Sequence, residues 1–484
     1  MNRDLTTLEP QLVWRHFEKI CSIPHPSTEE EALSKAIIEY AKSLSLECEI
    51  DHAGNVIIRK GATAGMESRQ CTLLQAHLDM VPQKNNDKEF DFSKDPIECY
   101  IDGEWVRANG TTLGADNGIG MAAALALLED PTAVHGDIEI LLTVNEERGM
   151  DGAEALKPDQ LRSTIMLNLD TEDEDELCIG CAGGLNLVAK MAHQITNTPR
   201  NGYVARRLEI KGLKGGHSGV QIHEQRANAN KLLFRLLRLT KLDIILVSAD
   251  GGTLSNAIPR EASVDLLIHK KDLKLFEEQV SRFKENITLE YTPVEESISL
   301  TLNEIAYPKK MIDQDSAALL VWAMAAAPDG VHNMSNTIPG LVQTSSNLAI
   351  VRTDDDSTMV EFFIRSASET QKVELADTIA SIFELADGDV SCTGSHPGWL
   401  PNPNSAILKV VKECFTKQYG EEPKVQAVHA GLECGLIGSI YPKMDMISMG
   451  PTIVSPHSPD ECVEIGSVAR FYTLLKSVLA NIPE

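Results

Sequence analysis

A histidine and an aspartate, His77 and Asp79, follow the apolar run of residues 71–76, which predicts a buried strand. The two residues are two positions apart, so in an extended segment their side chains point to the same side. Neutral imidazole is the commonest metal ligand in proteins, and a carboxylate often orients its second nitrogen. Taken alone, the pair fits a solvated surface better than a metal site, so its interpretation depends on the rest of the chain.

Two further predicted strands also end at acidic residues. The strand at 137–144 leads to Glu146 and Glu147, and the strand at 164–169 leads to Asp170. Solvated charges scatter without regard to strand ends, whereas ligand sites of open α/β sheets lie beyond the carboxyl ends of the strands. Adjacent residues of a strand point in opposite directions, so we expect one of the two glutamates to reach a metal and the other to face a substrate.

A glycine-rich turn at 110–120 contains Asp116 and opens a predicted helix at 121–128. It lacks the lysine of a phosphate-binding loop and the spacing of a dinucleotide fingerprint, so we do not expect it to bind nucleotide. A pair of divalent ions needs imidazole and carboxylate ligands, one bridging carboxylate, and a free carboxylate for proton transfer. The chain offers Glu146 for proton transfer and five candidate ligands, which are His77, Asp116, Glu147, Asp170 and His457.

The composition limits the partners. The 484 residues include 71 acidic and 44 basic ones, and the formal charge is −27 at pH 7. Such a field repels phosphate backbones and anionic membranes, so neither nucleic acid nor membrane is an expected partner. The first ten residues do not resemble a signal peptide and no apolar run approaches the length of a membrane span, so we expect a cytoplasmic protein. The lone Cys178-x-x-Cys181 pair fits buried free thiols better than a zinc site.

The remaining pattern predicts an α/β protein with a mixed, largely parallel sheet flanked by helices. Ser27 and Glu30 have the spacing of a capping box ahead of a helix that includes Leu33 and Leu44. The pattern of predicted elements changes in residues 188–398, where strands alternate with amphipathic helices and indicate an inserted α+β domain. We therefore expect a catalytic domain in two parts, 1–187 and 399–484, and an inserted lid or dimerisation domain at 188–398.

Six motifs together resemble one enzyme family. They occupy residues 75–86, 110–120, 212–219, 256–261, 429–435 and 450–461, and the similarity extends over nearly the whole chain. In order and spacing they resemble the co-catalytic di-zinc exopeptidases of the aminoacylase and carboxypeptidase type, most closely the dipeptidases among them.

The resemblance implies a role for each candidate ligand. Asp116 would bridge two divalent ions, with Zn²⁺ the first candidate and Mn²⁺ or Co²⁺ the others. Matching positions imply the other roles. One ion would be bound by His77 and Asp170, and the other by Glu147 and His457. Asp79 would orient His77, and Glu146 would be the general base. A cis peptide bond after Asp116 is also implied.

Four residues of the insert and the following segment match substrate-binding positions of the family. His217 would polarise the scissile carbonyl, and Asn256, Arg365 and Gly431 would hold the substrate backbone and its free carboxylate. The family also implies a homodimer. Because an arginine binds a carboxylate in a bidentate manner, such a site favours short peptides with a free C-terminus.

These residues lead to one main hypothesis and two alternatives. The main hypothesis is a metal-dependent dipeptidase that acts on unblocked dipeptides of broad specificity, including Xaa-His. An N-acyl amino acid deacylase would use the same two metals and the same base. A non-catalytic metal-binding protein would be expected to have lost Glu146 or a ligand, and this chain keeps all of them.

Overall fold

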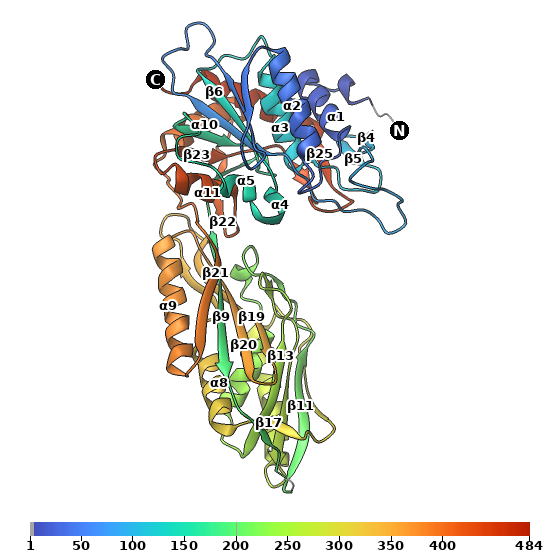
Figure 1. Cartoon of the computed structure of the whole chain (residues 1–484), viewed down its shortest axis with the longest axis vertical. Coiled ribbons are helices and arrows are strands. Elements are labelled where there is room, and N and C mark those ends of the chain that lie inside the picture. The colour runs from blue at the N-terminus through green and yellow to red at the C-terminus, as the bar shows by residue number, and fades with distance from the viewer. Residues whose placement is uncertain (1–3, 200) are drawn as a thin grey trace. The chain divides into compact units, whose positions relative to one another are not determined.

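The computed structural model describes residues 4–199 and 201–484, and the chain divides into two compact units (Figure 1). The first unit comprises Met1–Gly180, Pro401–Ala427 and Leu432–Glu484, and the second comprises Cys181–Leu400 and Val428–Gly431. The boundary expected after residue 187 falls inside strand β9 (Gly183–Ala192), because that strand belongs entirely to the second sheet.

The first unit is built on an eight-stranded mixed sheet. In spatial order its strands are β1 (Glu47–Ile50), β2 (Val56–Lys60), β6 (Ile138–Thr143), β3 (Thr72–His77), β7 (Ile165–Asn168), β23 (Asp445–Ser448), β8 (Glu176–Cys181) and β22 (Lys424–Val428). The four central strands, β6, β3, β7 and β23, run parallel, whereas β1, β2 and β8 pair in the antiparallel sense. The predicted α/β class with a largely parallel centre is confirmed.

Every residue of β3, β6 and β7 is buried, which explains their nearly continuous apolar sequences. The helices of this unit are α1 (Gln11–Cys21), α2 (Glu31–Ser43), α3 (Ala115–Leu127), α4 (Glu146–Gly149), α5 (Asp151–Glu154), α10 (Ala406–Tyr419), α11 (Glu433–Ile440) and α12 (Ile465–Ala480), with a 3₁₀ turn at Leu5–Thr7. Helix α3 packs on β3 and α1, α2 on β1 and β2, and α10 on β23 and α12. A small sheet of β24 (Ile453–Val454), β25 (Cys462–Glu464), β5 (Trp105–Ala108) and β4 (Cys99–Asp102) completes the unit.

The second unit contains a nine-stranded antiparallel sheet with helices packed against it (Figure 1). Its strands in order are β16 (Ser299–Glu304), β11 (Tyr203–Lys211), β15 (Ala262–His269), β13 (Ile244–Gly251), β19 (Val342–Thr353), β20 (Ser357–Ser366), β9 and β21 (Asp389–His396), with β18 (Gly330–Met334) paired to β19. The helices are α6 (Ala229–Leu239), α7 (Leu273–Tyr291), α8 (Gln314–Ala326) and α9 (Glu369–Leu385), with a 3₁₀ turn at Ile222–Glu224. The unit also contains two antiparallel two-stranded ribbons. One pairs β10 (Ile195–Asn197) with β17 (Lys310–Ile312), and the other pairs β12 (Gly216–His217) with β14 (Ala257–Ile258).

The predicted capping box at the start of α2 is wrong. The helix begins at Glu31, and neither Ser27 nor Glu30 caps it through its side chain. Thr28 has a positive φ of 77°, so the chain turns before the helix starts. The side chains of Ser27 and Glu30 bond instead to Asp79 and to the backbone of Asn145. The helix itself is confirmed, with Leu33, Ile37 and Ala41 on its buried face.

All ten cysteines lie among the described residues, and Cys178 and Cys181 are buried, as the sequence indicated. Across the described part of the chain, none of the helices combines the length and apolarity that a membrane crossing requires.

Candidate metal centre

His77 is the last residue of β3, and its side chain is 1% exposed. Its Nδ1 lies 3.0 Å from the backbone oxygen of Asp79 and is therefore assigned as the protonated nitrogen, which leaves Nε2 free to act as a ligand. Nε2 lies 3.2 Å from an oxygen of Asp116 and 3.4 Å from an oxygen of Asp170. The ends of β3 and β7 and the start of α3 thus bring three predicted ligands together.

Asp116 connects this group to a second one. Its Oδ1 faces His77, whereas its Oδ2 lies 3.1 Å from Nε2 of His457. The same His457 nitrogen lies 2.9 Å from Oε1 of Glu147. One ligand atom each of His77, Asp116 and Glu147 lies within 4.8 Å of the others. The other four predicted ligands therefore gather around the Asp116 carboxylate, whose two oxygens face different histidines.

The glycine-rich turn places Asp116 at this point. Gly114 precedes helix α3 with a left-handed φ of 70°, and a Cβ at Gly120 would collide with the Leu169 carbonyl oxygen at 2.5 Å. The glycines therefore serve a tight turn and the close approach of α3 to the chain after β7. The Asp116–Asn117 peptide bond is cis, as the family resemblance implied.

Glu146 and Glu147 do not continue the strand geometry from which their opposite directions were predicted. They begin the short helix α4, because Asn145 adopts a left-handed φ of 54° and turns the chain beyond β6. Asp79 accepts the backbone N–H of Glu146 at 2.9 Å and that of Glu147 at 3.2 Å, one on each carboxylate oxygen. Asp79, 1% exposed, also lies 3.4 Å from Nδ1 of His77. Its carboxylate thus contacts both the histidine and the turn.

Burial raises the pKa of Glu146 well above its ordinary value, and Asp170, Glu433 and Glu147 add to the shift against the opposing charge of His77. Burial likewise raises the pKa of Glu172 to about 8, with the charges of Asp116 and Asp170 acting in the same direction. Raised pKa values of this kind are expected where several carboxylates lie close together without compensating positive charge.

The two residues that face each other across the centre shift in opposite directions. Although burial opposes the change, hydrogen bonds with His457 and His77 hold the pKa of Asp116 well below its ordinary value. The hydrogen bond with Asp116 and the close carboxylate of Glu147 raise the pKa of His457 to about 11. The carboxylate form of Asp116 is therefore strongly stabilised at neutral pH.

These residues fit divalent cations. No ion pair between these carboxylates and a lysine or arginine occurs among the described residues, so two imidazoles alone face five carboxylates at 116, 146, 147, 170 and 172. Oε1 of Glu147 is buried and has no partner in hydrogen-bonding geometry, although His457 is near it. Imidazole nitrogens and carboxylate oxygens in such excess are the donor set of a co-catalytic metal site.

The sequence did not point to three buried carboxylates that support the centre. Glu461 accepts backbone N–H groups of all four residues from Leu113 to Asp116, at 2.7 to 3.3 Å. Glu433 accepts hydrogen bonds from Gln75 at 2.6 Å and Thr143 at 2.7 Å. Glu30 accepts the N–H of Asn145 at 2.9 Å. Glu433 and Glu461 lie inside motifs of the family resemblance and Glu30 matched a helix-cap pattern, but nothing in the sequence indicated these supporting contacts.

The second unit holds the predicted substrate-binding residues. Nδ1 of His217 accepts N–H groups from Gly219 and Val220, so its neutral ring carries the proton on Nε2. Nη2 of Arg365 lies 3.5 Å from that Nε2, and the Phe363 ring lies 4.4 Å from the guanidinium carbon. These contacts bring His217 and Arg365 together within the unit.

Asn256 and Gly431 were the other two predicted substrate-binding residues. The Asn256 backbone oxygen accepts the Ser218 N–H at 2.8 Å, and its side chain is exposed. Gly431 lies in the short segment Val428–Gly431 that belongs to the second unit rather than the first. Asn256 is therefore attached to the His217 turn through its backbone.

Arg365 is 5% exposed, and burial lowers its pKa to about 10. Its Nε is buried and lacks a hydrogen-bond partner, and no carboxylate of the described residues forms an ion pair with it. An unpaired buried guanidinium costs several kcal/mol unless an anion binds it. The arrangement is that of an anion-binding group.

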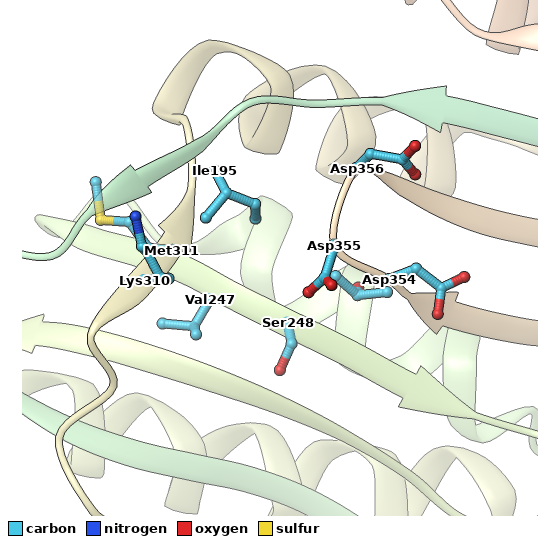
Figure 2. A pocket seen from close by; sticks show the side chains of 9 residues that line it. Ile195, Val247, Ser248, Lys310, Met311, Asp354, Asp355 and Asp356 are labelled. Atoms are coloured by element: carbon cyan, nitrogen blue, oxygen red, sulfur yellow. The ribbon is translucent and has the colours of Figure 1, made fainter.

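A separate hollow of the second unit, about 610 Å³ in volume, lies between the β19–β20 turn and β17 (Figure 2). Figure 2 shows Asp354, Asp355 and Asp356 on that turn, and Lys310 and Met311 on β17. The lining residues include neither histidine nor cysteine. It has the acidity but not the imidazole ligands of the centre around Asp116.

Comparison with protein families gives one match over most of the chain. The model described as Peptidase family M20/M25/M40 matches residues 73–481. Among curated proteins, the chain is 45% identical over 482 residues to the cytosol non-specific dipeptidase of Escherichia coli (strain K12), with 99% of each chain covered.

Solved structures give the same picture. The aminoacylhistidine dipeptidase of Vibrio alginolyticus superposes with a TM-score of 0.95 at 43% identity, covering 99% of this chain and 98% of that one. The aminopeptidase PepT of Bacillus cereus, at 14% identity, superposes with a TM-score of 0.58 over 98% of this chain and 99% of that one, and shares the fold.

Proposed function

The chain belongs to peptidase family M20/M25/M40 and is a peptide hydrolase, and on this basis we propose that it is a metal-dependent dipeptidase. Its substrates would be unblocked dipeptides of broad specificity, including Xaa-His. The names of the two relatives above 40% identity, a non-specific dipeptidase and an aminoacylhistidine dipeptidase, support this substrate class.

The observation that carries the proposal is the environment of Asp116. One of its oxygens faces His77 at 3.2 Å and the other faces His457 at 3.1 Å. A carboxylate that presents its two oxygens to two separate histidines is suited to bridge two ions. We assign His77 and Asp170 to one ion, and Glu147 and His457 to the other, with Asp116 shared.

Zn²⁺ is the proposed metal because imidazole and carboxylate ligands suit it, and Mn²⁺ or Co²⁺ have compatible preferences. When bound, such ions lower the pKa of a coordinated water to near neutrality and polarise a carbonyl oxygen. The backbone contacts of Asp79 and Glu461 hold the ligand-bearing turns in place, as supporting groups around metal sites do.

Glu146 is the proposed general base. It takes a proton from the attacking water as oxygen bonds to the scissile carbonyl carbon, and returns it to the leaving amine as the C–N bond breaks. Burial, the largest cause, raises the pKa of Glu146, which is the direction expected of a carboxylate that accepts a proton from water. Asp79 acts through Glu146 and His77 and touches no reacting atom.

His217 and Arg365 are proposed to bind the substrate. The proton on Nε2 of His217 is available to donate a hydrogen bond to the developing oxyanion. The unpaired guanidinium of Arg365 would bind the C-terminal carboxylate of a dipeptide. Asn256 and Gly431 remain proposed contacts of the substrate backbone.

Three further assignments concern the location, the second unit and the oligomeric state. We propose a cytoplasmic location, because the Escherichia coli relative is named a cytosol dipeptidase. We also propose that the second unit, which the sequence placed at 188–398, acts as a lid and as the homodimer contact of the family.

The experiment is a substrate panel on metal-stripped enzyme reconstituted with Zn²⁺, Mn²⁺ or Co²⁺. We expect hydrolysis of free dipeptides, including Xaa-His, that depends on added metal. N-acetyl amino acids are the matched alternative substrates for a deacylase. Hydrolysis of the N-acyl compounds in preference to dipeptides would reject the proposal.

A further inference from the structure

The turn that carries Glu146 and Glu147 is held by two carboxylates rather than one. Oε1 of Glu30 accepts the N–H of Asn145 at 2.9 Å, and the two oxygens of Asp79 accept the N–H groups of Glu146 and Glu147. Three consecutive backbone donors are therefore fixed by buried acceptors. Glu30 is 5% exposed, and its Oε1 also accepts the N–H of Thr28 at 3.0 Å.

Both carboxylates are linked through one N-terminal segment. Ser27 donates its hydroxyl to Asp79 Oδ2 at 2.7 Å, and its backbone N–H bonds to the Met80 carbonyl at 3.2 Å. Met80 in turn donates to the His25 carbonyl at 3.2 Å, and Pro26 and Met80 form a parallel bridge. Residues 25–30 thus lie against the chain that follows β3.

The turn requires such support because of its backbone conformation. Asn145 has a φ of 54°, a left-handed conformation that is uncommon for a residue other than glycine. Its orientation determines where the next two residues direct their carboxylates. A buried N–H group that loses its acceptor costs about 1 to 3 kcal/mol, which is enough to favour another conformation of the turn.

We propose that Ser27 and Glu30 are positioning residues for the proposed reaction: Glu30 fixes the Asn145–Glu147 turn directly, and Ser27 fixes it through Asp79. The family match begins at residue 73, so it does not include this segment. The proposal rests on the proposed function, since it concerns the placement of its general base, Glu146, and of the Glu147 ligand.

The expected effect follows from the bonds that are lost. Glu30→Ala removes the acceptor of the Asn145 N–H and leaves both Asp79 bonds in place. Glu30, Asn145 and Thr28 border a hollow of about 380 Å³, so the turn has room to adopt another conformation while the variant still folds. Supporting residues of metal sites typically contribute about 10- to 100-fold to activity or affinity, and we expect kcat to fall by that factor.

The experiment compares Glu30→Ala, Glu30→Gln and Ser27→Ala in full-length, metal-loaded enzyme with a dipeptide substrate. Glu30→Gln keeps the accepting oxygen and should restore most of kcat. Ser27→Ala removes one of three bonds to Asp79 and should lower kcat by a smaller factor. In each case kcat, normalised to bound metal, should change more than KM.

Glu29→Ala is the matched control, because Glu29 is the exposed neighbour of Glu30. It should leave kcat, KM and the melting temperature unchanged. Thermal unfolding of every variant separates loss of fold from loss of positioning. If Glu30→Ala fails to fold, the comparison of Glu30→Gln and Ser27→Ala with wild type decides the question.

Several results would overturn the proposal. Wild-type kcat in Glu30→Ala, or an equal loss in Glu30→Gln, would show that the accepting oxygen does not position the turn. If Ser27→Ala keeps the wild-type kcat, Ser27 does not position the turn through Asp79. If wild-type enzyme does not hydrolyse dipeptides at all, it is the proposed function that fails, and this result is distinct from the others.

Discussion

At the scale of single residues, the structure separates groups that already have partners from those that lack them. Asp116 has a histidine at each oxygen, and Asp79 has three hydrogen-bond donors. Arg365 is the contrast, since its buried Nε lacks a hydrogen-bond partner and no carboxylate of the described residues pairs with its guanidinium. A buried charge without an internal partner indicates that its counterion is a ligand.

Replacing Arg365→Ala should therefore weaken hydrolysis of dipeptides with a free C-terminal carboxylate, mainly through KM. A charged hydrogen bond contributes about 1.5 to 3 kcal/mol, so kcat/KM should fall by about 10- to 100-fold. Arg365→Lys should recover only part of this loss, because an ammonium does not form the bidentate pair. Steady-state kinetics on matched dipeptides and dipeptide amides measures the effect. An equal loss for the amides would contradict a carboxylate-binding role.

At the scale of elements, the centre depends on where strands end and helices begin. The buried strands β3, β6 and β7 were predictable from their apolar runs, and the candidate ligands were proposed from their positions just beyond these strands. The turns that follow are shaped by acceptors distant in sequence. Glu461 holds all four N–H groups of the segment that enters α3, from Leu113 to Asp116.

We expect Glu461→Ala to weaken metal binding by about 10- to 100-fold, because the turn that carries Asp116 would lose its four acceptor contacts. Glu461→Gln should not restore the affinity, since its amide would present donors to two of the N–H groups. Metal titration with a competing chelator measures the change. Asp460→Ala, at the exposed neighbouring position, is the control. Unchanged affinity in Glu461→Ala would show that the contacts do not position Asp116.

These supporting contacts also mark the limit of what the sequence predicts. A buried carboxylate that accepts hydrogen bonds has no fixed spacing from its donors, so the supporting roles of Glu30 and Glu433 could not be predicted from the sequence. Ser27 and Glu30 even matched the pattern of a helix cap, because the same residue types suit both uses. The strand-end geometry expected for Glu146 and Glu147 is wrong for a related reason, since the left-handed turn at Asn145 could not be predicted from an asparagine alone.

At the scale of the whole molecule, the proposed ligands come from both sides of the insertion. They occupy positions from 77 to 457, yet all five belong to the first compact unit. Bound ions would therefore join chain segments within that unit, and a ligand that binds only the folded state stabilises it by mass action. The second unit contains none of the proposed ligands.

Removal of metal by a chelator should therefore increase hydrogen exchange in the first unit, at residues 113–118 and 145–149. Exchange in β9 and β20 of the second unit should change little. At a free metal concentration about 100 times the dissociation constant, the stabilisation that is lost amounts to about 2.7 kcal/mol. Mass spectrometry of peptides from stripped and reconstituted enzyme measures both regions. Equal deprotection of both units would argue against a metal centre confined to the first.

The central claim is that Glu146 transfers the proton while other residues hold the two metals. Its most direct measurement is kcat and metal content of Glu146→Ala in the same preparation, with the exposed Glu154→Ala as control. Loss of a general base should lower kcat by about 10²- to 10⁴-fold. Metal analysis should still find about two divalent ions per chain, the number of a co-catalytic pair. Retained turnover, or loss of the metals together with the activity, would contradict the account.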